Sequence, residues 1–215
     1  MNLYNTLAYA AICSTLLPLI LLLVKFKALT LRLKLLGLLL LISFVTDVIC
    51  LYLAKHFQNT HPLFHFYTVI EDILLGTYYY LSFNSKKKRS AVLFLFILCL
   101  CASCINAIID SGLQNIDTLA SASKSVVLVF CSILLFIEFM HQIDTNLSFN
   151  ASAYWLNCGF FLYGALPLFC YVFYFSVMNS VELSFKAWAI YLITDILYHL
   201  ILSIGIWKHK TISQV

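Results

Sequence analysis

The sequence predicts an all-α, polytopic membrane protein: a bundle of seven transmembrane helices with its N-terminus outside and its C-terminus in the cytoplasm. Hydrophobic residues make up 63% of the 215 positions and charged residues only 10%, against about 45–50% and about 25% in soluble domains. Polar breaks divide the chain into seven apolar segments, each close to the roughly 20 residues that a spanning helix needs. Basic residues gather at alternate breaks, a distribution that orients a multi-pass protein.

Each segment is defined by the polar positions that bound it. The first is an apolar run that ends at Lys25, and because residues 1–5 carry no charge we expect it to remain as a span rather than to be removed as a signal peptide. The second and third are separated by the polar stretch 55–61, and the basic run 86–89 precedes the fourth. The predicted spans, with ends defined to within a few residues, are about 4–24, 33–54, 62–83, 90–110, 118–141, 153–178 and 185–207. The connections are too short for a soluble module, so a single domain covering 1–215 is expected.

Basic residues set the predicted orientation. Those that flank the first and third connections and the last span are Lys25, Lys27, Arg32, Lys34, Lys86, Lys87, Lys88, Arg89, Lys208 and Lys210. The positive-inside rule places this group in the cytoplasm, and only Lys55 and Lys186 fall in connections predicted to face outside. The same group accounts for the formal net charge of +4. We expect it to contact anionic membrane lipids, and we expect no nucleic-acid partner.

The cysteines predict neither disulfides nor a metal centre. All eight fall within predicted spans, where a free thiol behaves as a small hydrophobic group. Cys99 and Cys101 point to opposite sides of a helix, which argues against metal binding by their cluster with Cys104. No cofactor is expected.

Ionisable residues inside the spans are the main functional signal, because a charge at membrane depth costs at least about 3 kcal/mol unless it has a partner or water. Asp47, Glu71, Asp72 and Asp195 lie well inside predicted spans. At a rise of about 1.5 Å per residue, Asp47 and Glu71 lie about 10 and 13 Å below the outer surface. Lys124 lies about 10 Å deep by the same measure, and we expect it to pair with Glu71 or Asp47. These depths predict a polar cavity that opens to the outside.

The polar residues also fall on helix faces. Asp47 shares one face of the second span with Ser43, and Asp195 shares one face of the seventh with several aromatic residues. Each face should point into the bundle, because lipid offers no hydrogen-bond partner. Glu71 and Asp72 leave their helix about 100° apart, so we expect separate contacts with the second, fifth and seventh spans rather than one shared proton. The predicted ligand-binding residues are Glu71, Asp47, Asp72, Lys124, Tyr67, Asn106, Trp188, Tyr191, Asp195, Tyr198 and His199.

Several segments resemble a family of small, uncharacterised seven-span bacterial membrane proteins. They are "LLPLILLL" (16–23), "ISFVTDVICLYLA" (42–54), "FHFYTVIEDILL" (64–75), "YWLNCGFFLYG" (154–164) and "DILYHLILSIGIWK" (195–208). The resemblance implies a seven-helix fold in the inner (cytoplasmic) membrane of a bacterium, a recurring acid at Glu71, and a Trp-x-Asn motif at Trp155 and Asn157. Asn157 therefore joins the predicted ligand-binding residues. Asp195 and His199 stand where the family often has Asn, and the resemblance implies no activity.

Three functions compete at this site. We favour binding or sensing of a small amphipathic or cationic molecule, with Glu71 at the centre of an outward-opening pocket and signal output through a separate partner protein. The first alternative is proton-coupled transport with the same acids as a relay, although no internal repeat supports it.

The second alternative is a metal-dependent membrane hydrolase acting on lipid. Its metal ligands would be His65, Asp72, Asp195 and His199, with Glu71 as general base. His65 lies two or more helical turns shallower than His199, so the sequence favours a protein that is not an enzyme. A buried polar network that only locks the bundle is the structural alternative to all three functions.

Overall fold

The structure is a computed structural model, and it describes residues 3–56, 59–109, 118–144, 150–172 and 181–209. Within these ranges the chain is helical and contains no strand. The elements are α1 (Leu3–Val24), the short 3₁₀ helix η1 (Phe26–Ala28), α2 (Leu31–Lys55), α3 (His61–Ser82), α4 (Lys86–Ile109), α5 (Thr118–Asp144), α6 (Ala151–Val172) and α8 (Val181–Trp207).

Each of the seven predicted segments corresponds to one long helix. Most helices begin and end within three residues of the predicted limits, and α8 begins four residues earlier than predicted, at Val181. α4 starts at Lys86, so the basic run 86–89 forms its first turn instead of a loop. The predicted sixth span reached residue 178, but α6 is described only to Val172, and 173–178 lie outside the described residues.

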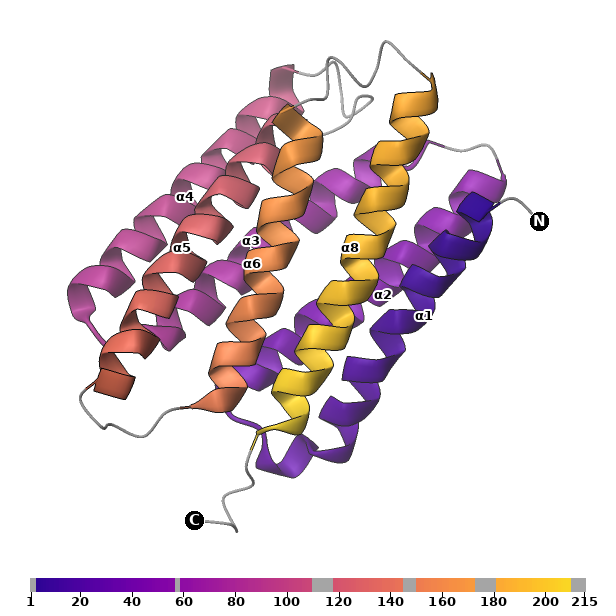
Figure 1. The fold of residues 1–215 in the computed structure, drawn as a ribbon. Helices are drawn as coiled ribbons and strands as arrows, with labels where there is room; N and C mark the ends of the chain where they lie inside the picture. Colours follow the sequence, from indigo (N-terminus) through magenta and orange to yellow (C-terminus); the bar gives the residue numbers. More distant parts are fainter. Residues whose placement is uncertain (1–2, 57–58, 110–117, 145–149, 173–180, 210–215) are drawn as a thin grey trace.

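The helices stand side by side as an antiparallel bundle (Figure 1). Contacts run around a closed ring in the order α1, α2, α3, α4, α5, α6, α8 and back to α1, with an additional contact between α3 and α5. α1 begins and α8 ends at opposite ends of the bundle, as an odd number of helices requires (Figure 1). Side chains from α2, α3, α6 and α8 can therefore meet across the interior of the ring.

The apolar side chains divide between an inner core and a large outer surface. Tyr79 and Phe160 are completely buried in the core. Leu23 and Phe66 are 70% and 65% exposed on the outside, although both are strongly apolar. Exposed apolar surface on this scale is a liability in water and is favourable in lipid.

Five helices of the described chain are long and apolar enough to cross a membrane: α1, α2, α4, α5 and α8. This indicates a multi-pass membrane protein. α3 and α6 are as long as the others, but they carry the polar residues of the interior, among them Glu71 and Asn157, which are 1% and 0% exposed. A helix that contacts protein on several sides does not need to be apolar all round.

Candidate functional site

Glu71 lies on α3, at the centre of the polar interior. α3 contacts α2, α4 and α5, so its acids can point into protein rather than outward. One carboxylate oxygen of Glu71 forms an ion pair with Lys124 of α5. The other accepts a hydrogen bond of 2.9 Å from the Tyr163 hydroxyl of α6. Glu71 therefore connects α3, α5 and α6. It is one of the two partners, with Asp47, that the sequence predicted for Lys124.

A small cavity lies beside Glu71, with room for about one water molecule. Two carboxylates, Glu71 and Asp195, contribute to its wall. The full lining is Leu39, Leu40, Ser43, Tyr67, Glu71, Tyr163, Asp195 and Tyr198, from α2, α3, α6 and α8. Helices on different sides of the ring thus meet at one polar point.

Tyrosines form most of the remaining polar wall. Tyr163 and Tyr198 stack with their ring centroids 4.6 Å apart and their planes 25° from parallel. The Tyr67 hydroxyl is in hydrogen-bond contact with Ser43 of α2. These rings hold their hydroxyl groups at the cavity, where they can donate to or accept from a small polar guest.

Carboxyl groups outnumber ammonium groups around this cavity. Asp47 and Asp195 lie within electrostatic range of Glu71 and of each other. Lys124 is the single buried lysine of the described chain. Three carboxyl groups and one ammonium group leave an imbalance that protons or a bound cation would neutralise.

Asp72 belongs to a different contact from its neighbour Glu71. Its side chain is fully buried and faces α4, where the Ser103 hydroxyl lies 3.4 Å from Oδ2. Ser103 lies on a different helix from Lys124 and Tyr163, which contact Glu71. For Asp72, contacts with α2, α5 or α8 stay a prediction.

His199 lies on the side of α8 that faces α1, outside the cavity lining. Its Nδ1 is 2.9 Å from the Ser14 hydroxyl and 3.8 Å from Asp195 Oδ2. A catalytic relay needs the acid and the nucleophile on opposite ring nitrogens. Here both face the same nitrogen, so the arrangement orients the ring and does not form a triad.

Asn157 forms a second polar cluster with Tyr79 and Ser132, two helical turns from Glu71 along α3. The Tyr79 hydroxyl lies 2.7 Å from Ser132 Oγ and 3.1 Å from Asn157 Oδ1, and the Asn157 amide donates to the Ser132 carbonyl at 2.9 Å. All three residues are buried and satisfy one another. Asn157 thus braces α3, α5 and α6 and does not line the cavity.

Two further predicted residues, Trp188 and Tyr191, are not among the described residues that line the cavity. Trp188 is 48% exposed. Tyr191 is half-buried and meets the Trp188 ring edge-on at 5.8 Å. The side chain of Asn106 lies outside the described residues.

Tyr163 was missed from the sequence. α6 contains many aromatic residues, and aromatic residues in a spanning helix usually belong to packing or to the interface belt. Nothing in the pattern of α6 separates the one tyrosine that reaches Glu71 from the rest. The signal is tertiary, because it depends on the rotation of α6 against α3.

The metal alternative lacks a common centre. Among the described residues, no three His, Cys, Asp or Glu side chains are placed to hold one ion. His65 and Asp72 lie on α3, whereas Asp195 and His199 lie on α8, with His199 turned toward Ser14.

Comparison of the chain with family models, with curated proteins and with solved structures found no match. The family resemblance of the sequence is therefore not supported by these comparisons. The functional argument depends on the geometry of the site alone.

Proposed function

We propose that the chain is a multi-pass membrane protein that binds a small molecule through a cationic group, at an interior site centred on Glu71. All seven helices cross the membrane in this proposal, with α1 beginning outside and α8 ending in the cytoplasm. The site opens to the outside. The observation that carries the proposal is the cavity whose wall includes both Glu71 and Asp195.

Charge supports a cationic guest. Lys124 neutralises one carboxylate, while Asp47 and Asp195 remain close to Glu71. An ammonium group has three donors, and carboxylate and tyrosine oxygens around the cavity are suitable acceptors. A cation entering here would also compete with Lys124 for Glu71, which couples binding to the contact between α3 and α5.

Size supports a small head group. A cavity for about one water molecule accepts a primary ammonium group but not a bulky quaternary one, unless the helices move apart. The stacked rings of Tyr163 and Tyr198 provide an apolar surface for the rest of an amphipathic amine. Transport and lipid hydrolysis stay alternatives without a specific observation in their favour.

The test is thermal unfolding of the full-length protein in a neutral detergent with added cations. Ethylamine, ethanolamine, tetramethylammonium and sodium are compared, with acetate as an anionic control. We expect the primary amines to raise the melting temperature most, because a ligand at about 100 times its Kd stabilises by about 2.7 kcal/mol. Asp195→Asn should lose this response.

The matched control is Glu138→Gln, which removes an acid at the far end of α5, where Glu138 pairs with Lys88. This variant should keep the full amine response. Equal responses in Asp195→Asn and the wild-type protein would show that the amine binds elsewhere. No response to any cation would contradict cation binding.

A further inference from the structure

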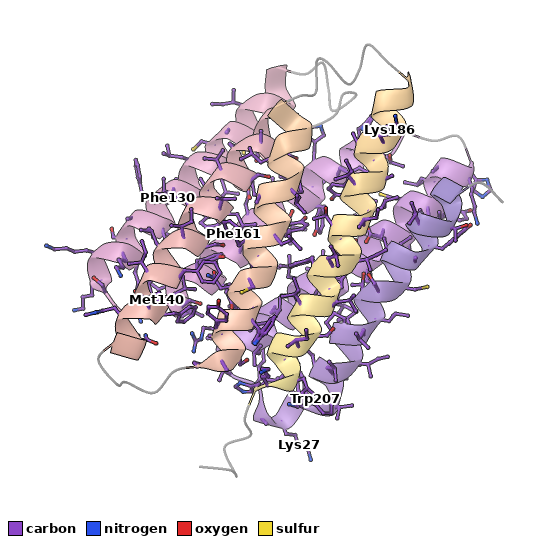
Figure 2. All side chains as sticks on the ribbon, viewed as in Figure 1. Lys27, Phe130, Met140, Phe161, Lys186 and Trp207 are labelled. Atoms are coloured by element: carbon purple, nitrogen blue, oxygen red, sulfur yellow. The ribbon has the colours of Figure 1, made fainter. Side chains whose placement is uncertain are left out.

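Five exposed lysines lie at the end of the bundle where α8 ends. They are Lys27, Lys34, Lys86, Lys87 and Lys208, and we call them the basic rim. Lys27 and Trp207 mark this end in Figure 2, and Lys186 lies at the opposite end. The rim comes from the α1–α2 connection, the start of α2, the start of α4 and the residue after α8, so it spans the width of the bundle.

The neighbouring basic residues are already engaged within the protein. Lys25 Nζ donates to the carbonyl oxygens of Ile206, Trp207 and His209 at 3.2, 2.7 and 3.1 Å. These are the carbonyl groups at the end of α8, so Lys25 caps that helix.

The acid at this end is engaged too. Glu138 forms an ion pair with Lys88 at 2.8 Å and accepts a hydrogen bond of 3.2 Å from the backbone N–H of Asn84. α5 also ends here, at Asp144. The rim lysines outnumber these acids and stay exposed, so this end of the bundle is positively charged.

Aromatic and apolar surface adjoins the rim. Lys34 lies 5.7 Å from the centre of the Phe26 ring, and Lys208 lies 5.7 Å from that of Trp155. Val24, in the turn before the rim, is 79% exposed. A partner of this surface should therefore carry negative charge directly beside apolar chains.

We propose that the basic rim binds the head groups of anionic phospholipids, while their acyl chains lie on the exposed apolar face below it. A nucleic acid or a free phosphate would use the lysines but leave the apolar surface uncovered. The lysines would contact the charged head group of a lipid, and the aromatic residues would lie at the interface between the head group and the acyl chains. This proposal depends on the membrane placement proposed above, but not on the amine site.

The test is native mass spectrometry of the full-length protein released from detergent, titrated with phosphatidylglycerol or phosphatidylcholine. We expect phosphatidylglycerol to bind about tenfold more tightly than phosphatidylcholine. Replacing the five rim lysines by Gln should reduce this preference to about twofold or less. The double variant Lys55→Gln/Lys186→Gln, at the opposite end, should retain it.

Three outcomes would overturn the proposal. They are an unchanged preference in the rim variant, an equal loss in the Lys55/Lys186 control, and binding of glycerol phosphate as tight as that of phosphatidylglycerol. Raised salt should weaken phosphatidylglycerol binding to the wild-type protein, a measurement that does not depend on folding of any variant. Failure of the amine assay would leave these results unaffected, and extraction of the protein from vesicles by carbonate would instead disprove the membrane placement.

Discussion

At the residue scale, Glu71 shows how a buried carboxylate is tolerated. Its two oxygens meet an ammonium group and a phenol hydroxyl, so both have a partner although the side chain is 1% exposed. Breaking a buried ion pair by removing one partner destabilises soluble proteins by about 3–5 kcal/mol, because the remaining charge has lost its compensation. Interior hydrogen bonds of membrane proteins are weaker, averaging about 0.6 kcal/mol.

Glu71→Gln should therefore lower the melting temperature of the purified protein, because it removes the ion pair between Glu71 and Lys124. Lys124→Met should also lower the melting temperature, because it removes the ammonium group that pairs with the Glu71 carboxylate. The double variant removes both charges, and we expect it to be more stable than the sum of the single effects predicts, with a coupling of about 1 kcal/mol or more. Additive effects in this cycle would contradict a direct interaction.

Tyr163→Phe is a milder change at the same carboxylate. It removes the 2.9 Å hydrogen bond to Glu71 and keeps the ring that stacks on Tyr198. Because interior hydrogen bonds of membrane proteins average about 0.6 kcal/mol, we expect a smaller decrease in melting temperature than for Glu71→Gln, and a weaker amine response. Tyr198→Phe is the control, because it removes a tyrosine hydroxyl at the same cavity but leaves the hydrogen bond between Tyr163 and Glu71 in place. A weaker amine response in Tyr163→Phe alone would therefore be due to that hydrogen bond.

At the element scale, close approach between helices depends on glycine. A Cβ atom at Gly205 of α8 would lie 2.8 Å from side-chain atoms of Leu156 and 3.1 Å from its backbone nitrogen. Ser152, at the start of α6, also donates to the Gly205 carbonyl at 2.7 Å. α6 and α8 are therefore held together at a distance that a side chain would prevent.

Gly205→Ala should destabilise the protein by about 1–3 kcal/mol through overpacking against Leu156. Gly37→Ala is the matched control, since its nearest neighbour, Leu22 Cδ1, would lie at 3.4 Å, an ordinary contact. Alanine is the better helix former by about 1 kcal/mol, so the control should be neutral or stabilising. Thermal unfolding of both variants measures this difference in stability. A Gly205→Ala protein as stable as the wild-type protein would show that α6 and α8 can move apart without losing stability.

At the scale of the whole molecule, the question is how many helices cross the membrane. Five of the described helices have both the length and the apolar composition of a span, whereas α3 and α6 have the length but are less apolar where they are described. In a bundle whose helices are antiparallel neighbours, removing α3 from the membrane would separate Glu71 from Lys124. This contact is the reason that the proposed function includes a crossing by α3.

Reporter fusions before and after α3 test this count. With seven crossings, a fusion at Asn59 lies outside and one at Ser85 lies in the cytoplasm, so alkaline phosphatase should be active at the first and inactive at the second, with green fluorescent protein giving the reverse. A fusion after Lys208 should match Ser85. The same reporter response at Asn59 and Ser85 would show that α3 does not cross.

The sequence by itself determined the helical class, the seven segments and the acids that need an interior. Those features depend on local composition, since about 20 apolar residues form a helix in lipid and an isolated charge there needs a partner. Helical periodicity also predicts that Glu71 and Asp72 leave α3 in directions about 100° apart.

Only the tertiary structure decided which partner each residue has. The pairing of Glu71 with Lys124 and Tyr163, and the turn of Asp72 toward α4, depend on the rotation and tilt of each helix against its neighbours. Packing of side chains around the whole ring sets those quantities, and no single segment encodes them. For this reason the sequence found Glu71 but missed Tyr163.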